Sequence, residues 1–272
     1  MNMYADFINV AFIFYGLAFF LYLFGFKKEI IPTLSYGLLL AGIINNFIAI
    51  LFRWFASGHP PLSSLYDVIL LLAFLLSSGC LFVDFIFNLK FILGFFGAFF
   101  SLLALGYTSF FGSITKPLIP QLKSNWILIH VTTYLLGYTA AFIAFIIGIL
   151  YLIKSRNSVI DKNHDFLKKL DEIGYISVMT CFPLLTLGLT TGAVWANVAW
   201  AHYWDWDPKE NWALITWIIY VVYIHLHLKG WRGRKMAYIA IIGFATILFT
   251  LIGVTFFLIS PHSYEAISSS VR

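Results

Sequence analysis

The sequence has few charged residues: 11% of its 272 positions are Asp, Glu, Lys or Arg, whereas 61% are hydrophobic. A soluble domain of this length needs more charge than this to cover its surface, so a water-soluble globular fold is excluded. The sequence also lacks a long hydrophilic stretch that could fold as a separate soluble domain. We therefore expect a single integral membrane domain over residues 1–272.

Cysteine is also scarce. Cys80 and Cys181 stand singly within apolar runs, without a CxxC pair or the spacing of zinc ligands. We expect both to be small buried hydrophobic side chains. The sequence therefore gives no sign of a cysteine-based metal or redox site.

What the sequence does contain is a series of apolar runs, each close to the roughly 20 residues that a helix needs to cross a membrane. The first run, Phe7 to Phe26, has no basic segment before it and no small-residue cleavage site after it, so we expect a retained span. The pattern predicts an all-α, polytopic membrane helix bundle of about eight transmembrane helices. Their predicted limits are 5–26, 32–54, 65–88, 91–110, 126–153, 173–195, 212–229 and 237–259.

The net charge of +5 is distributed as membrane topology requires, and we expect no nucleic-acid partner. Lys and Arg accumulate on the inner side of membrane proteins. If the amino terminus is outside, twelve of the seventeen Lys and Arg residues fall in inner segments, among them Lys27, Lys154 and Arg234. Both termini are therefore predicted to lie on the outer side of the membrane, which is periplasmic or lumenal.

The tryptophans are unevenly distributed, since six of the nine lie in the segment from Trp195 to Trp217. An ordinary aromatic belt would spread them over many helix ends. A dense aromatic surface beside the membrane suits a large, flat, apolar ligand. We expect an outer tryptophan-rich ligand-binding loop over residues 195–212, with these binding residues: Trp195, Trp200, Trp204, Trp206, Asp207 and Trp212.

Part of this segment also predicts a helix start. Asp207 can cap a helix whose first residue is Pro208, and Glu210 can reach back to the cap. Such a start would hold the loop rigid. If the backbone is extended, Trp204 and Trp206 face the same way.

The stretch WANVAWAHYWDWDPKENW resembles the tryptophan-rich WWD signature of the haem-handling proteins, a family that includes CcsA, CcmC and CcmF, and is most similar to the CcsA type. The resemblance extends over roughly residues 124–264, through SNWILIHVTTYLLGYTA at 124–140, YIHLHLKGWRGRK at 223–235 and HSY at 262–264. GHPPLSSLYD at 58–67 is also similar to CcsA-type sequences. Position 202 departs from the family pattern, because His202 stands where a small or polar residue is more usual, and it is not assigned as an iron ligand.

Two histidines are candidates for the axial ligands of a haem iron at the outer face. His130 and His262 flank the tryptophan segment and lie on its predicted side of the membrane. His130 shares a helix face with Trp126, Tyr134 and Gly137, and this glycine could let another helix approach closely. From spacing alone, both could equally be ordinary interfacial histidines. The resemblance assigns outer haem ligation to these two positions.

His225 is a candidate for a second haem site within the membrane. It lies toward the inner half of the seventh span, where a polar side chain is costly. His225 and His227 are two residues apart and point to nearly opposite faces, so one haem cannot take both. The resemblance assigns the iron to His225 and implies an opposite ligand from a partner membrane protein, CcsB (also called ResB).

The remaining polar residues near the spans have simpler interpretations. We expect Arg53 to snorkel to the interface or to meet a haem propionate, and Asp67 to begin the third span. Asp84 is expected near the inner end of that span. His59 is the internal alternative for the ligand opposite His225, but the predicted topology places it outside, so it is interpreted as a satisfied loop histidine. His164 is interpreted as a solvated one.

The resemblance implies a role in cytochrome c maturation of the system II type. Haem b would be both ligand and substrate, carried to the outer face and presented to the CxxCH segment of apocytochrome c for thioether attachment. The chain would form part of a holocytochrome c synthase, or haem lyase, with CcsB in a bacterial plasma membrane or a thylakoid membrane. The alternatives are a CcmC-like haem shuttle that makes no thioether bond, a b-type haem electron carrier, and an unrelated transporter.

Overall fold

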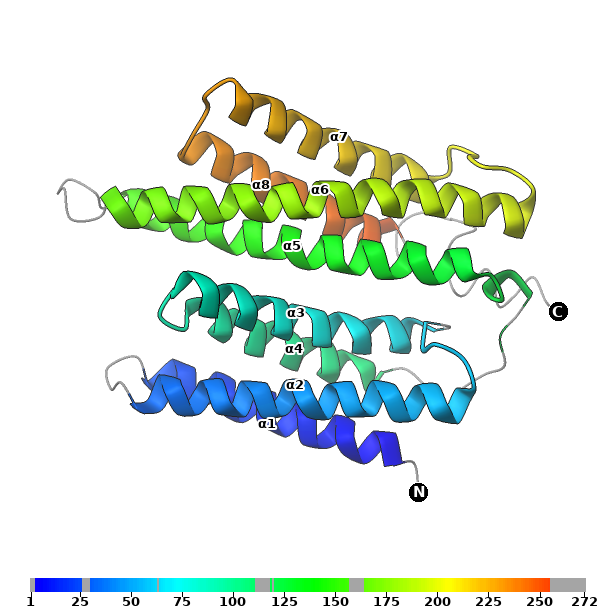
Figure 1. The fold of residues 1–272 in the computed structure, drawn as a ribbon, viewed down its shortest axis with the longest axis horizontal. Helices are drawn as coiled ribbons and strands as arrows, with labels where there is room; N and C mark the ends of the chain where they lie inside the picture. Colours follow the sequence, from blue (N-terminus) through cyan, green and yellow to red (C-terminus); the bar gives the residue numbers. More distant parts are fainter. Residues whose placement is uncertain are drawn as a thin grey trace. The chain divides into compact units, whose positions relative to one another are not determined.

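The computed structural model describes residues 3–25, 30–62, 64–110, 118, 120–156 and 164–254. Over these residues the chain is helical and has no strand, which confirms the all-α class. Figure 1 shows its elements: α1 (Met3–Gly25), α2 (Ile30–Ser57), α3 (Leu65–Phe87), α4 (Ile92–Thr108), the 3₁₀ turn η1 (Pro120–Leu122), α5 (Asn125–Arg156), α6 (His164–Trp200), α7 (Pro208–Leu228), α8 (Arg234–Leu248) and the π-helical turn η3 (Phe249–Gly253).

Among the described residues, seven helices are long and apolar enough to cross a membrane, and α4, with 17 residues, is shorter. Counted together, these apolar helices confirm the prediction of about eight spans. The largest difference concerns α6, predicted over 173–195, which extends at both ends to 37 residues. At 1.5 Å per residue it is about 55 Å long, well beyond the roughly 30 Å of a hydrocarbon core. Its polar first turns and its tryptophan-bearing last turn therefore extend past the apolar run.

The helices form two compact units, residues 1–119 with α1 to α4 and residues 120–272 with α5 to α8. The expectation of one membrane domain over the whole chain stays a prediction.

In the first unit a tyrosine stripe on α1 faces the core. Tyr4, Tyr15 and Tyr22 recur at intervals of eleven and seven residues, which places them on one helix face, and all three are buried. The Tyr15 hydroxyl lies 2.9 Å from Oγ of Ser77 on α3. A buried hydroxyl needs such a partner in the absence of water, so this contact joins α1 to α3.

Arg53 does not snorkel, and this expectation was wrong. Its side chain is 1% exposed, its Nε donates to the carboxylate of Asp67, and its guanidinium lies over the rings of Tyr4 and Tyr66, 5.2 and 4.4 Å from their centroids. Asp67 lies in the first turn of α3, as predicted, where Ser64 caps the helix. The carboxylate and the two rings give Arg53 a better environment than the membrane interface.

Asp84 lies in the last turn of α3, close to the helix end as expected. Its carboxylate accepts hydrogen bonds from the N–H groups of Phe91 at 3.1 Å and Gly94 at 2.7 Å. These groups belong to the start of α4, which has no side-chain cap of its own. Asp84 therefore replaces that cap and fixes the α3–α4 hairpin.

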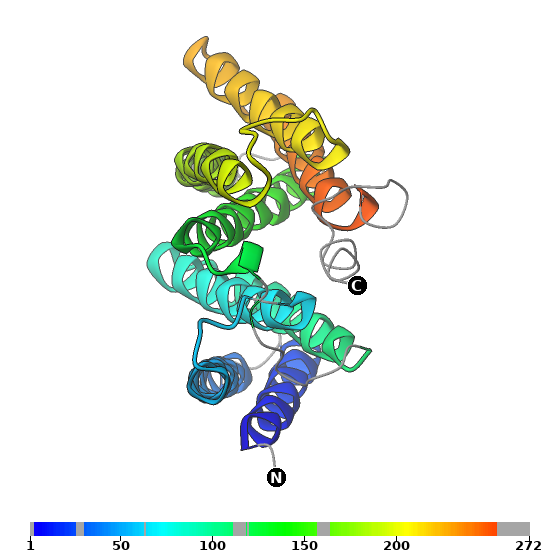
Figure 2. The same cartoon turned by 90° about the vertical axis from the view of Figure 1, so that its right-hand side faces the viewer.

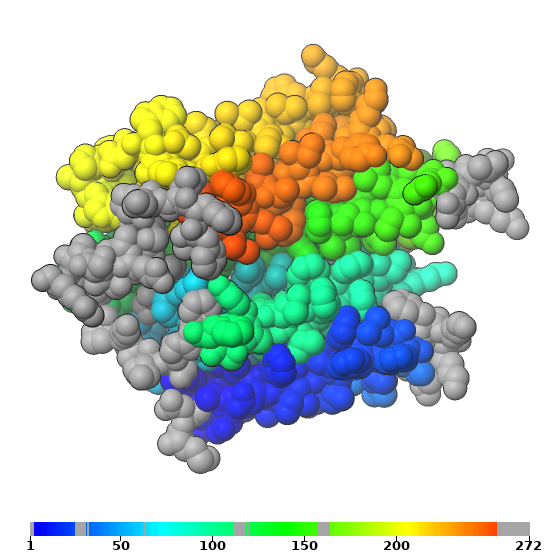
Figure 3. All heavy atoms as spheres, turned by 180° about the vertical axis from the view of Figure 1, so that it is seen from behind, coloured from blue at the N-terminus to red at the C-terminus, as the bar shows by residue number. Residues whose placement is uncertain are grey.

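In the second unit α5 and α6 run antiparallel and pack closely (Figure 1). Figure 3 shows α8 (orange to red) crossing one face of this unit between α7 and α5. Residues 120–130, 195–212 and 249–254 gather at one end, here named the loop end, onto which Figure 2 looks. The opposite end, here named the turn end, holds the α7–α8 turn at residues 229–233.

Candidate functional site

The tryptophan segment is more helical than expected. The predicted loop 195–212 is reduced to residues 201–207, because Trp195 and Trp200 belong to the last turns of α6 and Trp212 belongs to the start of α7. Helices therefore carry three of the predicted binding residues, and only Trp204, Trp206 and the capping Asp207 lie between them. A site built on helix ends is positioned more rigidly than one built on a long loop.

His130 lies near the start of α5 at the loop end, and its tautomer can be assigned. Its Nδ1 lies 2.8 Å from the carbonyl oxygen of Gly188 on α6. A carbonyl oxygen only accepts, so Nδ1 carries the proton and Nε2 carries the lone pair. This tautomer and its orienting hydrogen bond are typical of a metal-ligating histidine.

Small residues on α6 make room for the aromatic side chains of α5. A Cβ built on Gly192 would overlap the imidazole of His130, and one built on Gly188 would stand 2.9 Å from the ring of Tyr134. Gly137 of α5 likewise faces Leu185, as its predicted role in close approach requires. The sequence analysis missed Gly188 and Gly192, although their spacing of four residues on α6 mirrors that of His130 and Tyr134 on α5.

Trp195 lies against His130. The two rings are nearly parallel, at an interplanar angle of 19° with centroids 6.1 Å apart, and Trp200 meets Trp195 edge to face at 4.8 Å. Trp195 is buried, and its Nε1 donates to the carbonyl of Gln121 at 2.9 Å. Its indole therefore forms the wall that holds the histidine, and Trp200 extends this wall. The structure thus brings together three of the predicted site residues.

The predicted start of α7 is confirmed in detail. The Glu210 N–H donates to Oδ1 of Asp207 at 2.9 Å, and Glu210 Oε2 accepts the Asp207 N–H at 3.3 Å, which completes a capping box with Pro208 at the first helical position. Asp207 is buried and serves as a cap. Its predicted role in ligand binding stays a prediction.

The loop holds Trp206 in an unusual conformation. Its φ angle is +57°, so the backbone is left-handed rather than extended, and the condition for a common face with Trp204 is not met. Such a conformation costs on the order of 1–3 kcal/mol for a residue with a side chain. The indole of Trp206 is 66% exposed and meets Trp204 edge to face at 5.8 Å. The left-handed backbone thus holds an exposed indole.

Trp204 contributes an unused hydrogen-bond donor. Its Nε1 is buried and has no partner among the described residues. A buried donor without a partner costs about 1–3 kcal/mol. The group fits an acceptor on a bound molecule, such as a carboxylate.

Trp212 connects the loop to α8. Its ring packs on Phe249 of the π-helical turn, with centroids 4.3 Å apart. The chain therefore returns to the loop end before residue 254. The second predicted ligand, His262, lies outside the described residues.

The loop end presents exposed apolar side chains. Val198, Tyr203 and Trp206 are each more than half exposed, so apolar side chains of the α6 end and the loop are accessible. Among the described residues, no three His, Cys, Asp or Glu side chains gather as ligands for a bare metal ion. A single histidine in an aromatic wall instead fits the axial position of haem.

At the turn end the two neighbouring histidines of α7 point apart, as predicted. His227 is buried and stacks on Tyr175 of α6, with centroids 3.7 Å apart and planes within 8°. His225 is exposed, and its Nδ1 lies 2.9 Å from the Val221 carbonyl, which leaves the lone pair on Nε2. His225 lies in the last turn of α7, so it is close to the helix end. His227 is a packing residue, whereas the side chain of His225 points away from the helix bundle, where another molecule can reach it.

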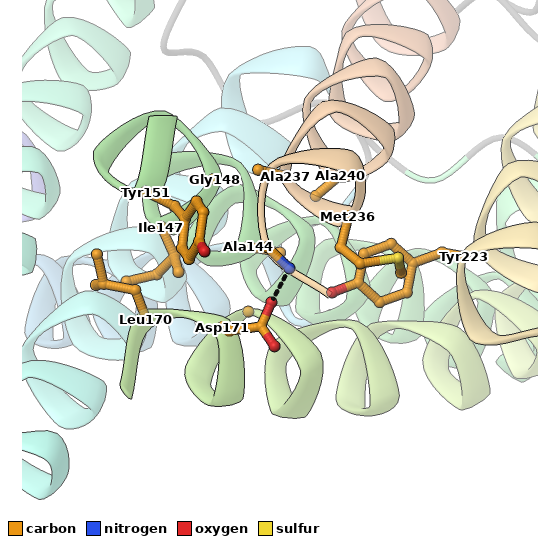
Figure 4. A pocket seen from close by; sticks show the side chains of 12 residues that line it. Ala144, Ile147, Gly148, Tyr151, Leu170, Asp171, Tyr223, Met236, Ala237 and Ala240 are labelled. Atoms are coloured by element: carbon orange, nitrogen blue, oxygen red, sulfur yellow. Dashed lines mark hydrogen bonds between the residues drawn. The ribbon is translucent and has the colours of Figure 1, made fainter. Parts of the chain in front are cut away.

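A cavity at the turn end is lined by α5, α6, α7 and α8 (Figure 4). Its volume of about 20 Å³ is enough for one water molecule, and it is far too small for a porphyrin. Asp171 accepts the Gly233 N–H at 2.8 Å, as the dashed line in Figure 4 shows, and the side chains of Tyr151 and Tyr223 also line the cavity. The hydrogen bond to Asp171 fixes the α7–α8 turn, and the cavity beside it is too small for a cofactor.

The other histidines have local partners. His59 Nδ1 lies 3.0 Å from the Pro60 carbonyl, which fits its interpretation as a satisfied loop histidine. His202 is exposed and lies 3.2 Å from Oδ2 of Asp205, and His164 is exposed beside Asp165.

Comparisons with known proteins identify the family of this chain. Residues 62–262 match the model of the family described as "Cytochrome C assembly protein". The chain is 38% identical over 256 residues to the cytochrome c biogenesis protein CcsA of Chlamydomonas reinhardtii, covering 88% of this chain and 69% of that protein. It is 34% identical over 258 residues to CcsA of Prochlorococcus marinus (strain MIT 9312), covering 83% of each.

A solved structure shares the fold. The cytochrome c haem lyase CcmF superimposes with a TM-score of 0.59 and 16% identity over 92% of this chain. The chain spans 46% of the length of that protein, so CcmF is the larger of the two. This likeness supports the fold alone, whereas the family match and the CcsA relatives include the loop end. The chain therefore belongs to the cytochrome c assembly family and, within it, to the CcsA cytochrome c biogenesis proteins.

Proposed function

We propose that this integral membrane protein acts in cytochrome c maturation by binding haem b at its loop end and presenting it to apocytochrome c. CcsA relatives from Chlamydomonas reinhardtii and Prochlorococcus marinus favour a thylakoid or bacterial plasma membrane. In the proposed topology both chain termini and the loop end face the outer side. The product is the thioether-linked haem of a c-type cytochrome.

The position of His130 carries this proposal. The Gly188 carbonyl sets its tautomer, Gly192 makes room for its ring, and Trp195 stacks along it. These contacts fix the direction of the Nε2 lone pair before any ligand binds, which reduces the entropy cost of binding. In the proposal, His262 supplies the opposite axial ligand.

In the proposal the tryptophans contact the porphyrin ring, whereas histidines bind the iron. Trp200, Trp204, Trp206 and Trp212 offer apolar surface from two helix ends and the intervening loop. The unpaired Trp204 N–H supplies a donor for a haem propionate. Such contacts orient the vinyl groups toward the incoming substrate.

His225 provides a second haem position in the proposal. Its imidazole projects from the exposed side of α7, so the opposite axial ligand comes from another protein. We assign that ligand to the CcsB partner. Haem would then pass from the turn end to the loop end.

Attachment needs no change in oxidation state. Each thiol of the CxxCH segment adds across a vinyl double bond: sulfur bonds to one carbon, and hydrogen goes to the other. The substrate histidine then replaces one protein ligand of the iron. The residues of this chain bind haem, orient it and cover the iron until that exchange.

Co-expression with CcsB and a CxxCH apocytochrome tests the proposal. We expect covalent cytochrome that keeps its haem after denaturation and extraction with acidified acetone. A protein that binds haem but yields no covalent product would instead be a shuttle. Rapid haem reduction by quinol without attachment would indicate an electron carrier.

A further inference from the structure

We propose that Glu210 is the positioning residue of the tryptophan loop: its carboxylate fixes the backbone on both sides of Trp206 and so sets the indole that contacts the ligand. This inference rests on the proposed haem site at the loop end. It gives Glu210 a role beyond that of a helix cap.

The hydrogen bonds of Glu210 exceed those of a capping box. That motif needs one bond from the N–H of the cap residue, here Asp207. Oε2 of Glu210 also accepts the N–H of Asp205 at 2.8 Å, which is shorter than its 3.3 Å contact with the Asp207 N–H. Asp205 lies two residues before the cap, so its bond adds nothing to α7. It acts on the loop.

Trp206 lies between these two N–H groups. Its own carbonyl oxygen accepts a hydrogen bond from Nδ2 of Asn211 at 2.7 Å. Two side chains from the first turn of α7 therefore fix the backbone before, at and after Trp206. The left-handed φ of Trp206 needs such support, because an isolated aromatic residue avoids it.

The hydrogen bonds of Glu210 order a side chain that is not part of the core. Glu210 is buried, while the indole of Trp206 that it positions is 66% exposed. Hydrogen bonds that served only folding would order a buried side chain. Here they hold the strained Trp206 with its indole exposed, which prepares a surface for a ligand and lowers the entropy cost of ordering that indole on binding.

The first test is amide hydrogen exchange over residues 201–208 in the full chain purified with its CcsB partner. We expect Glu210→Ala to lose protection at Asp205 and Asp207. Glu210→Gln should keep it, since an amide oxygen accepts the same bonds. Ser64→Ala, which removes the cap of α3, controls for the general loss of a helix cap. Unchanged protection in Glu210→Ala would overturn the inference.

The second test is haem content at the outer site, measured by absorbance per protein. We expect Glu210→Ala to lower it about tenfold and Glu210→Gln to keep it. Trp206→Ala should lower it by a similar factor, and the double variant should lose no more than either single change, because both act through one indole. If the double variant lost haem by the product of the two single losses, the positioning role would be refuted. It would also be refuted if Glu210→Ala lost amide protection but kept its haem content. The proposed haem site fails independently if His130→Ala keeps its haem.

Discussion

Gly192 lies directly beneath the imidazole of His130, so that a Cβ at position 192 would overlap the ring. The missing side chain is therefore a condition for the placement of the histidine. Helix α6 supplies both the space at Gly192 and, one turn earlier, the carbonyl of Gly188 that orients the ring.

Replacement of Gly192 by alanine should therefore lower haem binding although the proposed iron ligand, His130, is unchanged. Since the imidazole must move off α6, we expect outer haem content to fall at least about tenfold, while the amount of membrane-inserted protein stays similar. Gly37→Ala is the matched control, because nothing lies within 4 Å of the added methyl group. Equal haem content in both variants would contradict the role of Gly192.

Replacement by phenylalanine should have different effects at Trp217 and at Trp204, because only one of the two N–H groups has a partner. The Trp217 N–H donates to Thr186 at 2.9 Å, so Trp217→Phe should cost about 1 kcal/mol of stability with little effect on haem. The Trp204 N–H has no described partner and its burial is costly, so Trp204→Phe should not lower stability and should weaken haem binding several-fold. Thermal unfolding and haem titration measure the two effects. Loss of stability in Trp204→Phe would show that its N–H serves the fold.

The buried pair of Arg53 and Asp67 should behave as a structural ion pair. Removing one partner leaves a buried charge without its counter-ion, so Arg53→Ala should destabilise the protein by about 3–5 kcal/mol. The double variant with Asp67→Ala should lose less than the sum of the two single losses. Denaturant unfolding in detergent measures these values. Additive losses would argue against the pair, and a specific loss of haem in folded Arg53→Ala would favour the propionate role.

Substitution of His225 should affect haem binding, whereas substitution of His227 should affect packing. His227 stacks on Tyr175, so His227→Ala should lower the unfolding temperature and keep haem at the turn end. Exposed His225 supports no such packing, so His225→Ala should keep the unfolding temperature and lose that haem. Calorimetry and absorption spectra of the protein co-purified with the proposed CcsB partner distinguish the two. The reverse pattern would exchange the roles assigned here.

Much of the fold followed from periodicity and polarity. Helix positions were predictable because apolar runs of membrane length have few alternatives. The limits of α6 were not, because its first turns carry Lys168, Lys169 and Asp171, and a helix outside the hydrocarbon needs no apolar sequence. The environment of Arg53 was also missed, since its partner Asp67 lies on another helix.

The sequence named candidate site residues, but most of their contacts could not be predicted from it. Asp207 and Glu210 were predictable as a capping box because that motif is local in sequence. The bond from Asp205 to Glu210 and the left-handed Trp206 depend on the path of the whole loop, which no local rule specifies. The contact of His130 with Gly188 depends on the register of two helices, so spacing along one helix could not reveal it.

The most direct test of the central claim is the absorption spectrum of the protein purified with CcsB, compared with those of His130→Ala and His262→Ala. We expect a low-spin, bis-histidine haem in the unchanged protein. Either substitution should remove that signal from the outer site, and cytochrome c yield should fall with it. Outer haem spectra and cytochrome c yield that are the same in all three proteins would contradict the account.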